Sequence, residues 1–395
     1  MNKTYFSVSL VTLAIYLGFS ISGSDLFAQA APNFDVPSLS VRKSVHHEKL
    51  ELIRPDTSNS FFIGVNSGKK FMVWGFNYDH DTSGRLIEDY WFQDWDKVER
   101  DFEEMKKMGA NVVRIHLQFP KFMKSADLVN VEMLTQLKRL LGLAERVGMY
   151  LDITGLGCYH KNEVPEWYDA MNEEDRWAAQ CLFWEAISKT CEASPSIFCY
   201  DLMNEPILPG DNKPETEWLL GELGGKYFIQ RITLNLAGRN RYQVAKAWVD
   251  KLVAAIRKCD SRHMITIGEI PWAYTFLGAK PLFYSDSIGK NLNFVSVHFY
   301  PKKGDIANAL IALNVYKVGK PIVIEEMFPL LCSLDELDTF IDSSRNIASG
   351  WIGFYWGRSL KDFQNQNNLD MTEALIKGWL EYFQGKSKRI IETKK

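Results

Sequence analysis

Short apolar runs and amphipathic segments alternate along most of the chain. The apolar runs are four to eight residues long and end at glycine, proline or polar residues, which is typical of strands. Most of them are apolar on both faces, as expected for strands of a parallel sheet that is covered on both sides. Eight such runs are predicted to be strands, at residues 71–77, 111–117, 149–154, 197–203, 263–270, 294–298, 321–324 and 352–356.

Segments with apolar residues at helical spacing follow nearly every predicted strand. They are predicted to be helices at residues 94–108, 131–147, 173–193, 242–259, 305–318, 334–348 and 371–383. This alternation predicts an α/β fold, a (β/α)8 TIM barrel with loop insertions. An apolar run at 60–65 and polar residues at 66–69 also predict an N-terminal β-hairpin with the first strand. A doubly wound open sheet is the alternative, but no glycine-rich phosphate loop follows the first strand.

The N-terminus has the layout of an export signal. Lys3 precedes the uncharged, mostly apolar stretch 8–19, and Ala28-Gln29-Ala30 fits a small-x-small cleavage site. We therefore expect a secreted protein with no membrane attachment after cleavage, and an uncleaved membrane anchor is the alternative. The expected parts of the chain are a signal peptide at 1–30, a polar tether at 31–58, the barrel domain at 59–385 and a frayed polar tail at 386–395.

Composition limits the classes of partner and supplies candidate sugar-binding residues. The net charge is −3, so nothing points to nucleic acid or another polyanion as a partner. The six cysteines have spacings that match no metal site, and we interpret them as small buried hydrophobic residues. The 12 Trp and 16 Tyr residues can form cores or flat platforms for sugars. Candidate platforms in strand-end loops are Trp167, Trp218, Trp272 and Tyr274.

Acidic residues at two strand ends carry the clearest chemistry. Glu205 follows the fourth predicted strand, and Glu325 and Glu326 follow the seventh. In a closed barrel the C-terminal ends of these strands face each other across the mouth. Carboxyl groups about 5–5.5 Å apart suit retaining hydrolysis of a glycosidic bond, with one as nucleophile and the other as acid and base. Because successive strand residues face opposite ways, only one of Glu325 and Glu326 should point into the mouth.

Short motifs at several strand ends resemble those of one enzyme family. In chain order they are Gly75-Phe76-Asn77, Asn111-Val112-Val113-Arg114-Ile115, Asn204-Glu205-Pro206, His298-Phe299-Tyr300, the apolar run ending in Glu326, and Trp356. Together they are similar to glycoside hydrolase family 5, the cellulase and mannanase family of clan A. The resemblance covers residues 60–385 and places six motifs on the expected strands.

The resemblance implies roles for these residues. Glu205 would be the acid/base, and Glu326 the nucleophile, because an apolar residue (here Met327) typically follows the family's nucleophile. Asn204 would donate to the 2-hydroxyl of the substrate, and Trp356 would be the platform under the sugar. The remaining substrate-site residues that it implies are Asn77, Arg114, His298 and Tyr300, of which Arg114 and Tyr300 would support the nucleophile.

The sequence departs from the family pattern at two positions. Residues 152–155 (Asp-Ile-Thr-Gly) occupy the end of strand three, where the family usually has a His, and His160 is a candidate substitute. Glu325 stands before the nucleophile, where the family usually has a small residue. Two further strand ends carry candidates for polar contacts with the substrate. Asp79, His80 and Asp81 follow the first strand and Glu269 ends the fifth, although a hydrogen-bonded loop explains the first group more simply.

These observations predict a secreted retaining glycoside hydrolase. A β-linked polysaccharide or oligosaccharide is the expected partner, with β-mannan and β-1,4-glucan as the leading substrates. We expect a monomer that needs no metal and no cofactor. One alternative is a barrel that binds carbohydrate without catalysis. Another is a metal-dependent hydrolase, although only seven His residues are available as ligands.

Overall fold

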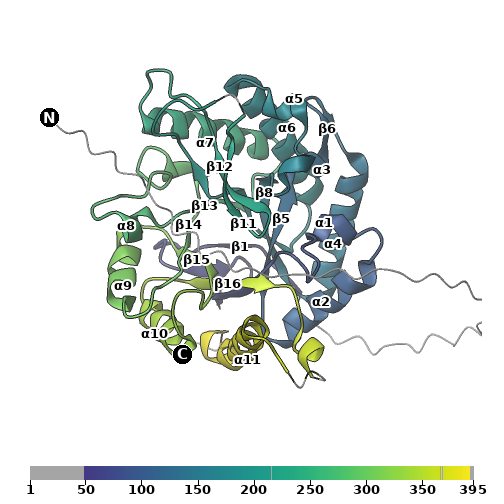
Figure 1. Cartoon of the computed structure of the whole chain (residues 1–395), viewed down its shortest axis with the longest axis vertical. Helices are drawn as coiled ribbons and strands as arrows, with labels where there is room; N and C mark the ends of the chain where they lie inside the picture. Colours follow the sequence, from purple (N-terminus) through teal and green to yellow (C-terminus); the bar gives the residue numbers. More distant parts are fainter. Residues whose placement is uncertain (1–48, 215, 365, 367, 392–395) are drawn as a thin grey trace, which may run out of the picture. The chain divides into compact units, whose positions relative to one another are not determined.

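A computed structural model describes residues 49–214, 216–364, 366 and 368–391 of the chain (Figure 1). The expected signal peptide at 1–30 and most of the expected tether at 31–58 lie outside these residues. Within them, none of the helices combines the length and the apolar character that crossing a membrane requires.

Eight parallel strands of the described residues close into a barrel, which confirms the predicted fold. Each strand pairs with the next one along the chain, and the last pairs with the first. The strands are β4 (Val73–Tyr78), β5 (Val112–Gln118), β8 (Tyr150–Gly157), β9 (Ile197–Asn204), β13 (Met264–Glu269), β14 (Val295–His298), β15 (Ile322–Met327) and β16 (Gly350–Trp356). A small antiparallel pair, β6 (Met123–Ser125) with β7 (Leu128–Val129), lies in the loop after β5.

Helices surround the barrel and bury its outer face (Figure 1). The longer ones are α2 (Trp95–Lys107), α4 (Val131–Val147), α6 (Glu173–Cys191), α7 (Arg241–Arg257), α9 (Ile306–Val315), α10 (Leu334–Ser344) and α11 (Met371–Ile391). The short ones are α1 (Ile87–Tyr90), α3 (Phe119–Phe122), α5 (Glu166–Asp169) and α8 (Trp272–Thr275). Three 3-10 turns lie at Lys161–Glu163, Gly289–Asn291 and Leu360–Phe363.

Side-chain caps fix the start of three of these helices. The side chain of Asn172 accepts a hydrogen bond from the backbone N–H of Asp175 at the start of α6. Asn240 and Ser333 do the same for α7 and α10, each with a Gln or Glu side chain bonding back to the cap. A cap of this kind stabilises a helix by about 1 kcal/mol, because it satisfies an otherwise unpaired backbone donor.

The C-terminal tail is ordered where the sequence predicts fraying. Helix α11 continues to Ile391, and Ile390 is fully buried. Lys386 is 3% exposed, and its ammonium lies 2.5 Å from Asp338 and 2.7 Å from Asp342 of α10. The expectation of a frayed tail from residue 386 is therefore wrong as far as Ile391. It failed because a polar sequence can still pack when its charges find partners on a neighbouring helix.

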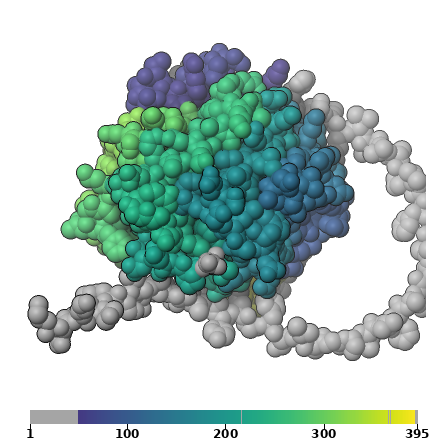
Figure 2. All heavy atoms as spheres, turned by 90° about the horizontal axis from the view of Figure 1, so that it is seen from above, coloured from purple at the N-terminus to yellow at the C-terminus, as the bar shows by residue number. Residues whose placement is uncertain are grey.

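A small antiparallel sheet closes the N-terminal end of the barrel. It consists of β1 (Ile53–Pro55), β2 (Phe62–Gly64) and β3 (Lys70–Phe71), and the β2–β3 pair confirms the predicted hairpin. Phe62 packs edge-on against Phe198 and Phe294 inside the barrel, with ring centroids 5.2 and 5.3 Å away. Figure 2 shows the N-terminal residues, in purple, gathered on one face. Strand β1 corrects the expectation that the sequence up to residue 58 is irregular.

Loop insertions build a second small sheet at the opposite end of the barrel. Residues 206–240 contain β10 (Pro206–Ile207), β11 (Leu219–Leu223) and β12 (Lys226–Arg231), in the order β10-β12-β11. This sheet lies beside the end of β9, because Asn204 Nδ2 donates to the carbonyl of Phe228, 2.9 Å away. In Figure 1 its strands are drawn in teal across the middle of the barrel.

The barrel interior changes from apolar to polar along its axis. Val73, Val112, Phe198, Val323 and Ile352 belong to one apolar cluster, which also takes in Phe62 of the N-terminal sheet. Two to four residues further along the strands the buried residues are polar or charged: Asn77, Arg114, Thr154, Asp201 and Glu325. The polar layer lies next to the C-terminal mouth, so the chemistry of the molecule is expected there.

Candidate active site

The predicted acidic residues meet at the C-terminal mouth of the barrel. Glu205 Oε1 lies 2.9 Å from His298 Nδ1, and that nitrogen lies 3.5 Å from Glu326 Oε2. One carboxylate oxygen of Glu205 and one of Glu326 lie within 4.8 Å of each other. Two carboxyl groups this near each other can act on the same glycosidic bond, as the pair of carboxylates in a retaining glycosidase does.

Glu205 is held in an uncommon backbone conformation. Its φ is +47°, and its backbone N–H donates to the carbonyl of Gly268, 3.0 Å away on β13. A non-glycine residue in this region costs about 1 kcal/mol or more and persists where the surrounding structure fixes it. Gly268 itself cannot carry a side chain, because a Cβ there would lie 2.8 Å from His298 Nε2 and 2.9 Å from Glu325 Oε2.

Both carboxylate oxygens of Glu326 accept strong hydrogen bonds. Arg114 Nη1 donates to Oε1 at 2.7 Å, and the Tyr300 hydroxyl donates to Oε2 at 2.7 Å. The side chain is 9% exposed, so one edge reaches the mouth. Burial raises the pKa of Glu326, while the charges of His298 and Arg114 oppose that shift. The result is a carboxylate with fixed orientation at the mouth.

Arg114 organises the polar layer from the middle of β5. It is fully buried, and Nη2 donates to Asp201 Oδ2 and Asn204 Oδ1, both at 2.8 Å. Nη1 also donates to Asn77 Oδ1 at 2.9 Å. Burial opposes its charge, but the carboxylates of Glu325, Asp201 and Glu326 raise the pKa of Arg114 further above its usual range. Arg114 therefore positions the carboxylates and does not reach the solvent.

The side chains of Asn77 and Asn204 mainly make hydrogen bonds within the barrel. Asn77 is fully buried, and its Nδ2 donates to the carbonyl of Glu325 at 2.9 Å. Asn204 is 1% exposed, with its oxygen on Arg114 and its nitrogen on the carbonyl of Phe228. In this arrangement one Asn204 amide hydrogen is engaged by β12, which leaves the other for a substrate hydroxyl.

Glu325 lies under Glu326 and also faces the site. It is fully buried, with Oε2 3.3 Å from His298 Nε2 and 3.4 Å from Arg114 Nη2. Burial opposes its charge, but Arg114 and His298 lower the pKa of Glu325 to about 2. A register shift in the β14–β15 pair, between Val297 and His298, breaks the simple alternation of faces. Glu326 alone reaches the mouth, and Glu325 supports it from the barrel interior.

His298 is a buried cation between three carboxylates. Its Nδ1 faces Glu205 and Glu326, and its Nε2 faces Glu325, so both ring nitrogens can donate only as an imidazolium. Burial lowers the pKa of the ring, but Glu326, Glu205 and Glu325 together raise it to about 10. The ring is therefore an imidazolium at neutral pH, and its Nδ1 lies between Glu205 and Glu326.

The unusual end of strand three forms part of the polar layer. Asp152 is fully buried, and burial together with the charge of Glu325 raises its pKa well above the ordinary value. The interaction between Asp152 and Glu325 raises the pKa of Asp152 and lowers that of Glu325. Thr154 Oγ1 donates to Asp201 Oδ2 at 2.8 Å. This departure from the family pattern keeps a buried hydrogen-bond network intact.

His116, which the sequence interpretation missed, lies in the polar layer beside Asn77. His116 Nδ1 lies 2.7 Å from the Tyr159 hydroxyl, and its Nε2 lies 3.2 Å from Asn77 Oδ1. His160 instead faces Asp89 at 3.3 Å, and no contact among the described residues joins it to Glu205 or Glu326. The available signal was spacing, because His116 follows Arg114 by two residues and so shares its strand face.

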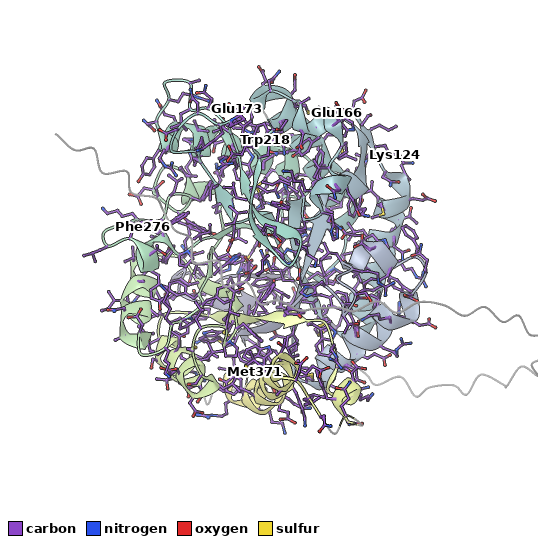
Figure 3. All side chains as sticks on the ribbon, in the orientation of Figure 1. Lys124, Glu166, Glu173, Trp218, Phe276 and Met371 are labelled. Atoms are coloured by element: carbon purple, nitrogen blue, oxygen red, sulfur yellow. The ribbon has the colours of Figure 1, made fainter. Side chains whose placement is uncertain are left out.

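Trp356 is not part of the site. Trp356 is fully buried in the core outside the barrel, packed against Phe76 at a centroid distance of 5.3 Å. A register shift between Gly353 and Trp356 turns it away from the mouth, so the expectation of a sugar platform there is wrong. The half-buried ring of Phe354 faces the insertion instead. Trp272, on α8, stacks on Phe276, which Figure 3 shows at the outer edge of the domain.

Among the residues that the structure describes, two side-chain clusters have the spacing of metal ligands, but each already contains a cation. Glu205, His298 and Glu326 form one cluster, and Asp89, His160 and Glu163 form the other. Arg114 and the protonated His298 supply positive charge to the first. Lys121 lies 3.0 Å from Asp89 and 2.7 Å from Glu163 in the second. A metal ion would meet like charge in both places, so neither donor set suits one.

Comparisons with known proteins place the chain in a family and its barrel among solved structures. A sequence model of the family described as Cellulase (glycosyl hydrolase family 5) matches residues 66–327. A search of curated proteins found no match. The barrel is similar to an exo-beta-1,4-mannosidase from Opitutaceae bacterium strain TAV5, with a TM-score of 0.62 and 15% identity over 85% of this chain. The chain spans 63% of the length of that structure.

Two further solved structures are similar over nearly their whole length. A beta-mannanase from the blue mussel Mytilus edulis has a TM-score of 0.56 and 16% identity, and the match covers 87% of this chain and 97% of that one. A beta-glucanase from Saccharophagus degradans has a TM-score of 0.54 and 16% identity, with 90% and 98% covered. At these identities the likeness extends to the fold alone.

Proposed function

The chain belongs to glycosyl hydrolase family 5, and from that premise we propose that it is a retaining glycoside hydrolase acting on a β-linked polysaccharide or oligosaccharide. The observation that carries the proposal is the pair Glu205 and Glu326 at the barrel mouth. Their oxygens lie within 4.8 Å, and Arg114 and Tyr300 hold both oxygens of Glu326.

The proposed first step forms a covalent glycosyl–enzyme. A carboxylate oxygen of Glu326 attacks the anomeric carbon, and the bond from that carbon to the leaving oxygen breaks. Glu205, as the acid, gives its proton to the leaving oxygen, so that the aglycone departs as a neutral alcohol. Arg114 and Tyr300 keep Glu326 aligned and favour its charged form before the attack.

The second step hydrolyses that ester. Glu205, now a carboxylate, removes a proton from water, and the water oxygen attacks the same anomeric carbon. The bond to Glu326 breaks, its carboxylate is restored, and Glu205 holds the proton again. Two inversions give net retention of the β configuration. The imidazolium of His298 faces both groups, so it lies beside the one that is charged at each stage: Glu326 before the attack and Glu205 in the glycosyl–enzyme.

β-Mannan and β-1,4-glucan are the substrates that we propose first. The solved structures with a similar barrel include a beta-1,4-mannosidase, a beta-mannanase and a beta-glucanase, and these names support a β-linked mannan or glucan as the substrate. We also propose that the protein is secreted and acts as a monomer. Secretion rests on the signal-like N-terminus at 1–30.

A nucleophile variant with azide tests this proposal. Glu326→Ala should lose turnover by about 10³-fold or more on aryl β-mannosides or β-glucosides. Azide should restore part of it and yield the α-glycosyl azide, whereas Glu205→Ala with azide should yield the β-glycosyl azide. The control is Glu174→Ala, which changes an exposed Glu on α6. Near-normal turnover of Glu326→Ala would remove the nucleophile assignment.

Substrate identity is tested by a screen of the wild-type protein. Purified protein is incubated with mannan, cellulose, xylan, β-1,3-glucan and aryl glycosides, and released reducing ends are measured. We expect release from mannan or a β-1,4-glucan. Calorimetric binding of a hexasaccharide without any release would instead favour a carbohydrate-binding barrel that lacks catalysis.

A further inference from the structure

The hairpin formed by β11 and β12, residues 219–231, crosses the mouth of the barrel; we refer to it as the roof hairpin. Backbone and side-chain hydrogen bonds tie it to the end of β8. The N–H of Tyr227 donates to the carbonyl of Tyr159 at 3.0 Å, and Gln230 Nε2 donates to the carbonyl of Leu156 at 2.8 Å. The bond from Asn204 to the carbonyl of Phe228 attaches it to β9 as well.

On the opposite side of the mouth, the roof hairpin contacts β16 and the loop after β4. The ring of Phe228 lies 5.4 Å from that of Tyr159 and 6.4 Å from that of Phe354 on β16. Lys226 is only 5% exposed, and its ammonium lies 3.6 Å from where a Cβ on Gly84 would stand, in the loop after β4. The hairpin therefore spans the mouth from β8 and β9 to β16 and the loop after β4. Figure 1 shows β11 and β12 in front of the barrel strands.

The position of the acid indicates which end of a substrate lies under this roof. Glu205 faces His298 of β14, so the leaving oxygen lies on the side of β13 and β14. In the order of the barrel, β4 and β5 lie opposite these strands. The sugar attacked by Glu326 therefore extends over Arg114 toward β4, under the roof hairpin. The leaving chain extends the other way, past α8, away from the strands that the roof hairpin contacts.

Asp79 offers a polar anchor at the closed end. It directly follows β4, is 1% exposed, and its Oδ2 lies 2.6 Å from His80 Nδ1. Its Oδ1 is buried and has no hydrogen-bond donor among the described residues. Burial opposes its charge, but His80 and the ammonium of Lys226 help to lower the pKa of Asp79. A buried carboxylate oxygen without a donor is costly, and a hydroxyl group would satisfy it.

We propose that the roof hairpin closes the glycone side of the site and that Asp79 binds hydroxyl groups of the terminal sugar, so that the enzyme removes sugar residues from the non-reducing end. The proposal rests on the hydrolase function proposed above. It adds the orientation of the substrate in the site and cleavage from the chain end instead of within the chain. A chain that continued beyond the bound sugar would meet Phe228 and the backbone that Tyr227 donates from, which are already hydrogen-bonded or packed to the barrel.

The first test compares hexasaccharides with free and blocked non-reducing ends. Wild-type protein is incubated with manno- and cellohexaose, each with and without a 4,6-O-benzylidene cap, and the products are followed by mass. We expect monosaccharide and pentasaccharide from the free substrate, and at least a 50-fold lower rate from the capped one. Internal cleavage of the capped chain at an unchanged rate would overturn the inference while leaving the hydrolase function intact.

The second test asks whether Asp79 recognises hydroxyl groups. Asp79→Asn should lower kcat/KM for an aryl glycoside about 10-fold or more, because it weakens a hydrogen bond to charge. On aryl glycosides that lack the 3- or 4-hydroxyl, the wild type should be slow already, and Asp79→Asn should cause little further loss on one of them. Equal losses on all substrates would overturn the role of Asp79.

The matched control is Asp81→Asn, which changes the same loop. Asp81 is engaged by Arg85, with Nε at 3.0 Å and Nη2 at 2.8 Å, so we expect no preference between the deoxy substrates in this variant.

Should the wild type cleave neither hexasaccharide, the hydrolase function fails separately. Calorimetry with methyl β-mannoside and methyl β-glucoside then still decides on Asp79, since unchanged affinity in Asp79→Asn would overturn its role.

A shortened roof tests the closure itself. Replacing residues 222–227 by an Asn-Gly turn should add internal cleavage of the capped hexasaccharide to the product pattern. Phe228→Ala is the milder variant if the shortened protein does not fold, and it should raise the rate on the capped substrate in the same direction. Product patterns that stay identical to the wild type in both variants would contradict the closure.

Discussion

Glu325 and Glu326 are neighbours in the sequence, yet both side chains contact Arg114. The two side chains lie at different depths in the barrel. Glu326 reaches the mouth with two strong donors on its oxygens, and Glu325 lies below it with Arg114 and His298. A buried charge is tolerated only with such partners, because its desolvation is otherwise costly. Glu325 therefore holds the cationic His298 in place from below and does not reach the mouth.

Glu269 shows the opposite case of a buried acid without a cation. It ends β13, is 1% exposed, accepts one bond from the N–H of Leu282, and burial raises its pKa to about 8. The folded protein therefore holds a proton that the unfolded chain loses near pH 4.5. Its contribution to stability is complete below that pH and is lost as the pH rises through about 8.

Glu269→Gln should remove this dependence, since the amide is neutral at every pH. We expect the variant to unfold at a higher urea concentration than the wild type at pH 9, and at a similar or lower one at pH 5. The wild-type slope due to this group is about 1.4 kcal/mol per pH unit at most. Glu166→Gln, an exposed change on α5 (Figure 3), is the control. Parallel pH curves for Glu269→Gln and the wild type would refute the assignment.

Two elements differ from expectation because of contacts between distant segments. In β16, the register shift against β4 buries Trp356 in the outer core and leaves Phe354 facing the roof hairpin. At the C-terminus, α11 extends through a polar sequence because Lys386 pairs with two acids of α10. In both elements a long-range contact decides the outcome, and the local pattern alone points the other way.

Truncation after Gly385 should therefore destabilise the domain. It removes the ion pairs of Lys386 and the fully buried Ile390, and loss of one such apolar side chain costs about 2–5 kcal/mol. Truncation after Ile391 is the control and should leave the unfolding temperature unchanged. The measurement is thermal unfolding followed by circular dichroism. A variant ending at Gly385 that melts with the wild type would restore the idea of a frayed tail.

The barrel as a whole is closed differently at its two ends. The N-terminal end is filled by apolar side chains of the small sheet, with Phe62 fully buried among aromatic rings. The C-terminal end carries charged and polar groups, and the roof hairpin covers part of it. Stability and chemistry are thus separated along the barrel axis, as in other barrels of this type.

This separation predicts that Phe62→Ala reduces stability and leaves turnover intact. Removing a buried Phe side chain costs about 3–5 kcal/mol, and Phe62 lies at the end of the barrel away from Glu205 and Glu326. Urea unfolding and kcat on an aryl glycoside, measured well below the unfolding transition, check the two parts. Phe61→Ala, at the half-buried neighbouring position, should cost much less. A large fall in kcat of the folded Phe62→Ala protein would contradict the separation.

The resemblance to the family pointed to Arg114, His298 and Tyr300, whereas local patterns in the sequence by themselves determined the barrel, the order of its strands, and the position of Glu205 and Glu326 at strand ends. These follow from local periodicity and from the rule that parallel strands end at the same rim. Tertiary structure alone decided three matters: the depth of Glu325 relative to Glu326, the presence of His116 rather than His160 in the polar layer, and the burial of Trp356. Each depends on a register shift or a packing contact between segments far apart in the chain, and such contacts leave no periodic signal in the sequence.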